Sequence, residues 1–146
     1  PIKKILIVDD SPTERHALSE LLVKSGFNIV TAESGEEAIS KSKSEMPDLI
    51  LMDVVMPGMN GYQATRTITR EEATKHIPVV MCTSKGQETD KIWGMRQGAN
   101  DYLVKPIQAA MYSARFSITR AMVSPRLSRR LWAQWPKRLA MASSSR

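Results

Sequence analysis

The sequence is poor in the residues that build disulfide frameworks and soft-metal sites. Its 146 residues include one cysteine and two histidines, which excludes an internal disulfide framework and a cysteine-built zinc site, and disfavours a histidine-rich one. No apolar run approaches the roughly 18 residues of a membrane span. The first residues show no cleavable signal. We therefore expect a reduced, cytoplasmic protein.

Acidic residues are absent after Asp101, and this divides the chain into two parts of opposite charge. Residues 1–106 carry a net charge of −2, whereas residues 107–146 carry +8. The hydrophobic content of 42% and the charged content of 25% are ordinary for a globular domain. The basic end therefore needs an explanation separate from that of the body.

Short apolar runs alternate with helical patterns along the body. The runs are apolar on both faces, which is typical of parallel strands covered by helices on each side of the sheet. The expected strands are 5–8, 28–32, 49–52, 77–82 and 101–104. The expected helices are 12–25, 35–44, 62–72, 88–97 and 107–123. This order predicts an α/β fold with a doubly wound, five-stranded parallel sheet.

Two of the expected helices have recognisable start signals. Ser11 with Glu14, and Ser34 with Glu37, have the spacing of a capping box, in which two side chains satisfy backbone N–H groups reciprocally. Gly26 has the position of a glycine that ends the first helix.

Polar residues follow four of the expected strands: Asp9 and Asp10, then Asp53, Thr83 and Lys105. Ligands of open α/β sheets bind at the carboxyl edge where the winding direction switches, so these residues should meet there. Clustered carboxylates suit Mg²⁺, and an aspartate beside it can act as a nucleophile toward phosphorus. A threonine hydroxyl and a lysine would contact the phosphoryl oxygens. The set meets the requirements of phosphoryl transfer.

Each of these residues also has an ordinary structural interpretation. An acid at a strand end is usually a turn residue or a helix cap, and Thr83 could cap the next helix. Their combined recurrence after successive strands favours a shared site. A small hydrolase with an aspartyl nucleophile is a weaker alternative, because it would need a second acid where Val55 stands.

Four segments carry a family resemblance: residues 5–11 (ILIVDDS), 51–61 (LMDVVMPGMNG), 80–84 (VMCTS) and 102–106 (YLVKP). Together they resemble the response-regulator receiver domains of two-component signalling, which are CheY-like. The resemblance covers about residues 3–106. It implies a flavodoxin-like sheet with strand order 2-1-3-4-5, and a signalling domain that accepts a phosphoryl group rather than an enzyme.

The resemblance assigns roles to individual residues at the carboxyl edge. It implies that Asp53 is the phosphoacceptor. It implies that Asp9, Asp10 and Asp53 hold Mg²⁺ together with the backbone carbonyl of Val55.

Three further residues receive roles from the same resemblance. Thr83 and Lys105 would contact the phosphoryl group, and Thr83 and Tyr102 would form a switch pair. The implied partners are a chemotaxis-type sensor histidine kinase and an output protein that binds the face of helix 4, strand 5 and helix 5.

Residues 9–14 (DDSPTE), 61–66 (GYQATR) and 87–99 (QETDKIWGMRQGA) resemble a narrower group. They are similar to the PilH-like single-domain regulators of type IV pilus twitching motility. The resemblance therefore implies a single-domain response regulator in a chemotaxis-like motility pathway.

The family likeness fades after Ile107. We expect the receiver domain to occupy residues 1–123 and a basic, irregular tail to occupy residues 124–146. Arginines interleaved with tryptophans in the tail suit nucleic acid or membrane headgroups. The alternative function is therefore a constitutive nucleic-acid- or membrane-surface-binding protein on a receiver scaffold. A disordered tail, or an end altered by a changed reading frame or by cloning, also fits the composition.

Overall fold

The computed structural model describes residues 2–24, 26–83 and 88–104, with the backbone alone at residues 83, 88–91 and 101–104. These residues belong to one compact unit, Ile2–Pro106. The helix expected at 107–123 and the tail expected at 124–146 lie outside the described residues, as does the proposed domain boundary between them.

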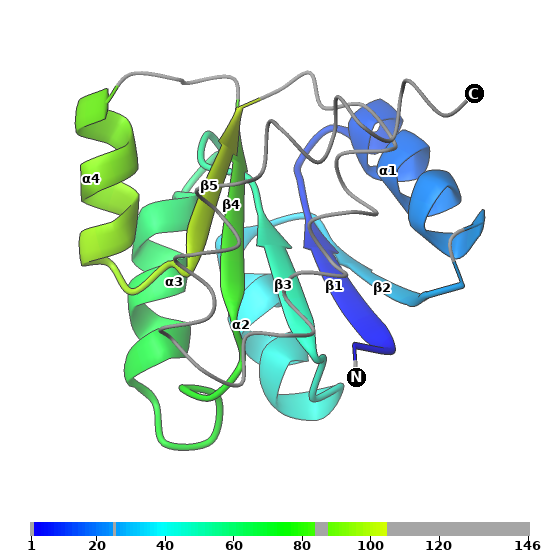
Figure 1. Ribbon diagram of the computed structural model, residues 1–146, viewed down its shortest axis with the longest axis horizontal. Helices are drawn as coiled ribbons and strands as arrows, with labels where there is room; N and C mark the ends of the chain where they lie inside the picture. The colour runs from blue at the N-terminus through cyan, green and yellow to red at the C-terminus, as the bar shows by residue number, and fades with distance from the viewer. Residues whose placement is uncertain (1, 25, 84–87, 105–146) are drawn as a thin grey trace, which may run out of the picture. The chain divides into compact units, whose positions relative to one another are not determined.

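Strands and helices alternate along the described chain (Figure 1). The strands are β1 (Lys4–Val8), β2 (Asn28–Ala32), β3 (Leu49–Met52), β4 (Val79–Thr83) and β5 (Asp101–Val104). The helices are α1 (Pro12–Lys24), α2 (Gly35–Ser44), α3 (Gly61–Arg70) and α4 (Glu88–Arg96).

All five strands form one parallel sheet in the order β2-β1-β3-β4-β5. Both the α/β class and the strand order expected from the sequence are confirmed. After β1 the chain first adds β2 on one side and then β3 on the other. The winding direction therefore switches between β1 and β3, and a ligand site is expected at their carboxyl ends.

Alternate strand residues supply the two faces of the sheet. Leu6, Val8, Ile50, Met52 and Met81 belong to one hydrophobic cluster with buried residues of α2 and α3, and each is at most 1% exposed. These two helices lie side by side, and an ion pair of 2.8 Å between Lys43 and Glu71 joins α2 to the end of α3. Helix α1 contacts β1 and β2. Burial of both faces explains why β3 and residues 5–8 of β1 are apolar throughout, whereas the edge strand β2 is only partly buried and carries Asn28 and Thr31.

Strand β4 begins two residues later than the sequence predicts. The N–H of Ile77 donates to the carbonyl oxygen of Thr74 at 3.0 Å, within the turn that follows α3. Pro78 has no N–H to donate. The strand therefore starts at Val79, although Ile77 itself is buried.

Both expected serine caps are present, and the start of α2 differs in detail from the expected capping box. The hydroxyl oxygens of Ser11 and Ser34 accept from the N–H groups of Glu14 and Glu37, at 3.3 and 3.1 Å. The Glu37 carboxylate, however, accepts from the N–H of Glu33 at 3.1 Å, one residue before the position that a capping box requires.

A complete capping box occurs at the start of α3, where a helix was expected at 62–72 but no start signal was recognised. The Asn60 side chain accepts from the N–H of Gln63, and the Gln63 side chain accepts from the N–H of Asn60, both at 3.0 Å. The box starts the helix at Gly61 rather than Tyr62. Among the described helices, none has the length and apolar composition that crossing a membrane requires.

Candidate functional site

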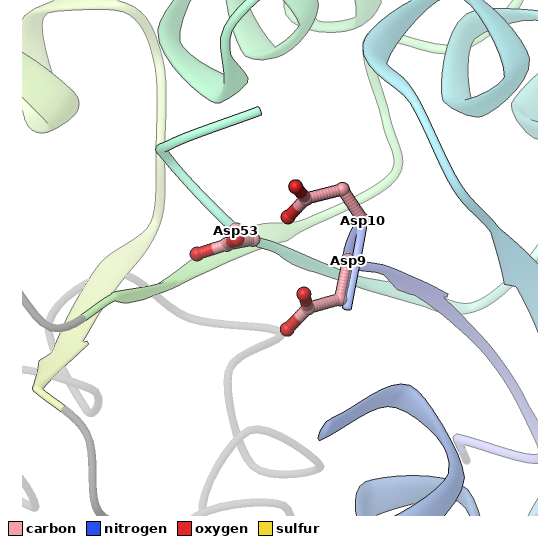
Figure 2. Close-up of side chains that lie close together, drawn as sticks. All are labelled: Asp9, Asp10 and Asp53. Atoms are coloured by element: carbon pink, nitrogen blue, oxygen red, sulfur yellow. The ribbon is translucent and has the colours of Figure 1, made fainter. Parts of the chain in front are cut away.

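Three aspartates meet where the winding direction of the sheet switches. Asp9 and Asp10 follow β1, and Asp53 follows the adjacent strand β3. The N–H of Asp53 donates to the carbonyl oxygen of Val8 at 2.9 Å, which joins the two strand ends. One carboxylate oxygen from each aspartate lies within 4.8 Å of the other two (Figure 2). The clustering expected from the sequence is present.

The three carboxylates differ in exposure. Asp9 is 4% exposed and Asp53 is 8% exposed, whereas Asp10 lies at the surface. Asp9 Oδ1 accepts from the N–H of Ser11 at 2.9 Å, and Asp53 Oδ1 accepts from the N–H of Val54 at 3.0 Å. The cluster therefore combines two buried carboxylates with one at the surface.

The donor set fits a hard divalent cation. Three like charges at this separation repel one another, and a cation between them removes the repulsion. Mg²⁺ is bound through oxygen ligands of this kind. One carboxylate oxygen from each of the three aspartates lies within 4.8 Å of the other two, so all three could serve a single ion.

The loop after Asp53 is held by close packing. Val54 and Met56 are buried in the core, and Val55 between them is 55% exposed. At Gly61, a Cβ would lie 2.0 Å from the carbonyl oxygen of Asp53, and the Gly61 N–H donates to the Val54 carbonyl oxygen at 2.9 Å. Only glycine permits this approach of α3. In the sequence Gly61 is the residue before the helix expected at 62–72, and the available signal was its position directly after Asn60, a common N-cap residue.

The remaining predicted site residues are only partly described. Thr83 ends β4 beside β3, so its backbone reaches the same edge of the sheet as Asp53. Tyr102 lies within β5 in register with Met81. The side chains of Thr83 and Tyr102 and the whole of Lys105 lie outside the described residues.

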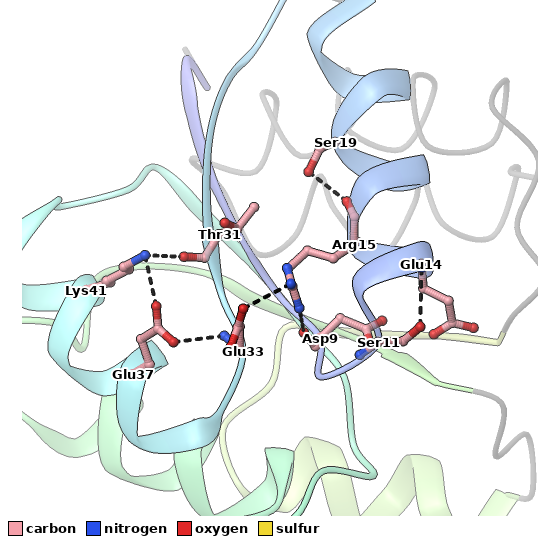
Figure 3. A network of polar contacts seen from close by, with 9 residues as sticks. All are labelled: Asp9, Ser11, Glu14, Arg15, Ser19, Thr31, Glu33, Glu37 and Lys41. Atoms are coloured by element: carbon pink, nitrogen blue, oxygen red, sulfur yellow. Dashed lines mark hydrogen bonds and ion pairs between the residues drawn. The ribbon is translucent and has the colours of Figure 1, made fainter.

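Arg15 contacts the site and was not recognised from the sequence. Its guanidinium donates from Nη1 to the Asp9 carbonyl oxygen at 2.8 Å, and Nη2 lies 3.1 Å from Oε1 of Glu33 (Figure 3). The only available signal was a basic residue one turn into the helix that follows the two acids. That signal is weak, because arginine is a common helix former.

A polar network continues from Glu33 into α2 (Figure 3). The hydrogen bond from the Glu33 N–H, followed by the hydrogen bond from Lys41, holds the pKa of Glu37 below its ordinary value. The Lys41 ammonium also donates to the carbonyl oxygen of Thr31. The loop after β2 is therefore tied both to α2 and to the loop that carries Asp9.

A family model described as the response regulator receiver domain matches residues 5–116. The chain belongs to this family. The receiver resemblance read from the sequence is confirmed, and with it the general function of a receiver domain in two-component signalling. Such domains take phosphoryl groups from histidine kinases and act through partner proteins.

Individual relatives agree with this assignment. The chain is 54% identical to Protein PilH of Pseudomonas aeruginosa over 104 residues, which is 71% of this chain and 86% of that protein. It is 31% identical to the chemotaxis protein CheY4 of Vibrio cholerae, with a TM-score of 0.74, covering 82% of this chain and 98% of that one. Among other curated relatives are the transcriptional regulatory proteins PhoB of Escherichia coli, at 37% identity, and PhoP of Bacillus subtilis, at 38%; the chain spans about half the length of each.

One solved relative has a metal in its site. The receiver domain of the sensor histidine kinase PA1611 of Pseudomonas aeruginosa has a magnesium ion coordinated in the active site cleft. It is 30% identical to this chain with a TM-score of 0.69, covering 75% of this chain and 90% of that one. Neither this likeness nor the family match tests the basic tail, so the nucleic-acid or membrane alternative stays a prediction.

Proposed function

We propose that this chain is a response regulator that accepts a phosphoryl group on Asp53. The observation that carries the proposal is the convergence of Asp9, Asp10 and Asp53 at the switch point of the sheet. In the transfer, an Asp53 carboxylate oxygen forms a bond to phosphorus. The bond from phosphorus to the histidine nitrogen of a kinase breaks, and its electron pair returns to that nitrogen.

Asp9, Asp10, Asp53 and the Val55 carbonyl would hold Mg²⁺, as the oxygen-only donor set favours. The bound ion would neutralise charge on the transferring group. In this proposal the Thr83 hydroxyl and the Lys105 ammonium bind the phosphoryl oxygens, and Tyr102 changes position together with Thr83 when Asp53 is modified.

We further propose that the pathway is the control of type IV pilus twitching motility, with a chemotaxis-type histidine kinase as phosphodonor. The PilH-like segments and the identity of 54% to PilH support this. The output partner would bind the face formed by α4, β5 and the expected helix 107–123. Ile92, Trp93 and Met95 of α4 are each about half exposed, at 46, 51 and 47%, which supports a contact surface there.

The test is phosphorylation by acetyl phosphate with Mg²⁺, measured by intact mass on the full chain. We expect the wild type to gain one phosphoryl group, and both Asp53→Asn and removal of Mg²⁺ by a chelator to abolish the gain. Glu72→Gln is the matched control, because it removes a carboxylate that is 88% exposed and lies outside the aspartate cluster. Labelling of Asp53→Asn at the wild-type level would contradict the assignment of the phosphoacceptor.

A further inference from the structure

Arg15 places a largely buried cation behind the acidic site. Its side chain is 14% exposed, whereas its partner Glu33 is 70% exposed. Nη1 donates to the main-chain carbonyl oxygen of Asp9, and the carboxylate that Nη2 contacts is that of Glu33, outside the aspartate cluster (Figure 3). Balancing the negative charge of the cluster would not require a bond to the main chain, so this geometry indicates a further role.

The contact with Arg15 completes a set of hydrogen bonds that fixes Asp9 at three atoms. The Asp9 N–H donates to the Ala32 carbonyl oxygen at 3.1 Å, and Oδ1 accepts from the Ser11 N–H at 2.9 Å. The Asp9 carbonyl oxygen accepts from Arg15 at 2.8 Å. This carbonyl belongs to the peptide that leads into Asp10. Because the peptide unit is planar, holding its oxygen also fixes the Cα of Asp10.

Asp10 depends on this support more than the other two aspartates do. Its side chain is exposed, so packing does not restrict it as packing restricts Asp9 and Asp53. The orientation of its carboxylate toward the cluster then depends on the direction of the backbone from which it projects. A metal ligand held by a hydrogen-bonded second layer binds more tightly than one that must first be ordered.

We propose that Arg15 is a positioning residue for the metal site: it orients the Asp9–Asp10 peptide so that both carboxylates face Asp53. The inference rests on the proposed function, because it assumes that the cluster binds Mg²⁺. The change in Mg²⁺ affinity on removing Arg15 distinguishes two roles. A positive charge repels Mg²⁺, so if Arg15 acted mainly through its charge, its removal would tighten Mg²⁺ binding. If Arg15 acts mainly by positioning the peptide, its removal weakens Mg²⁺ binding.

The experiment is a titration of the ¹⁵N-labelled full chain with MgCl₂, followed through amide chemical shifts near the three aspartates. We expect Arg15→Ala to weaken Mg²⁺ binding about tenfold, the size typical of losing an outer-layer partner. Arg15→Lys keeps the charge and one possible donor, and should recover part of the affinity. Thermal unfolding of each variant separates this effect from a general loss of stability.

Glu33→Gln is the matched control, because it removes the exposed ion pair and leaves the bond from Arg15 to Asp9. We expect it to change Mg²⁺ affinity by about threefold at most, as for other exposed pairs. Unchanged or tighter binding by Arg15→Ala would overturn the inference while leaving the proposed function intact. Absence of Mg²⁺ binding by the wild type would instead contradict the metal site, and with it both proposals.

Discussion

The two loops that carry the aspartates are held in place by different kinds of interaction. The loop after β1 is held by polar contacts: Ser11 and Arg15 bind Asp9 through hydrogen bonds of 2.9 and 2.8 Å. The loop after β3 is held by close packing, since Val54 and Met56 are buried and Gly61 lies directly against the carbonyl of Asp53. The two loops are therefore expected to tolerate very different substitutions, although they carry neighbouring carboxylates of one cluster.

Packing tolerates added volume least, so the largest effect is expected at Gly61. A Cβ there would lie 2.0 Å from backbone oxygen, and main chain cannot move aside as a flexible side chain can. We expect Gly61→Ala to lower the free energy of unfolding by about 3 kcal/mol or more and to weaken Mg²⁺ binding. Chemical denaturation of the full chain measures the first effect.

Gly26→Ala is the control for this substitution. Gly26 has a φ of +92°, but a Cβ at this position would have no atom within 4 Å, so alanine there meets backbone strain without a clash. A loss of about 1 kcal/mol is expected. Equal losses at the two glycines would show that the close approach at Asp53 is not what makes Gly61 necessary.

Substitutions in the loop after β1, which is held by hydrogen bonds, should have smaller effects than Gly61→Ala, and Ser11 tests this. Ser11→Ala removes the hydroxyl that accepts from the Glu14 N–H, while the main-chain N–H of residue 11 can still donate to Asp9. We expect a loss of about 1 kcal/mol in the free energy of unfolding, as for other N-cap residues, with Mg²⁺ affinity nearly unchanged. A large loss of affinity would mean that the cap, and not only the main chain, positions the acids.

The smallest effect is expected from the pH dependence of Glu37. Its folded-state pKa lies below the ordinary value of 4.5 because it accepts hydrogen bonds from the Glu33 N–H and from Lys41. A lowered pKa gives stability that is present above the unfolded-state pKa and is lost as the pH falls through the folded-state value. Glu37→Gln should therefore flatten the stability profile slightly below about pH 4.5. Thermal melts between neutral pH and about pH 3 provide the measurement, and an unchanged profile would contradict the prediction.

Much of the fold could be predicted because the signals that define it are short in range. Apolar runs and caps depend on residues within about four positions of one another. The three clustered aspartates could also be anticipated, since parallel strands bring their carboxyl ends to one edge. The capping of α2 could not be predicted in detail. The Glu37 carboxylate can accept from the N–H of Ser34 or of Glu33, and the conformation of the folded loop decides for Glu33.

The sequence by itself determined the parallel α/β architecture, the position of the acids along it, and the segregation of positive charge after Asp101. Only the tertiary structure decided that Arg15 reaches the Asp9 carbonyl and Glu33, and that Gly61 lies against Asp53. The reason is physical: periodicity specifies which face of an element is buried, whereas such contacts depend on how finished elements pack against one another.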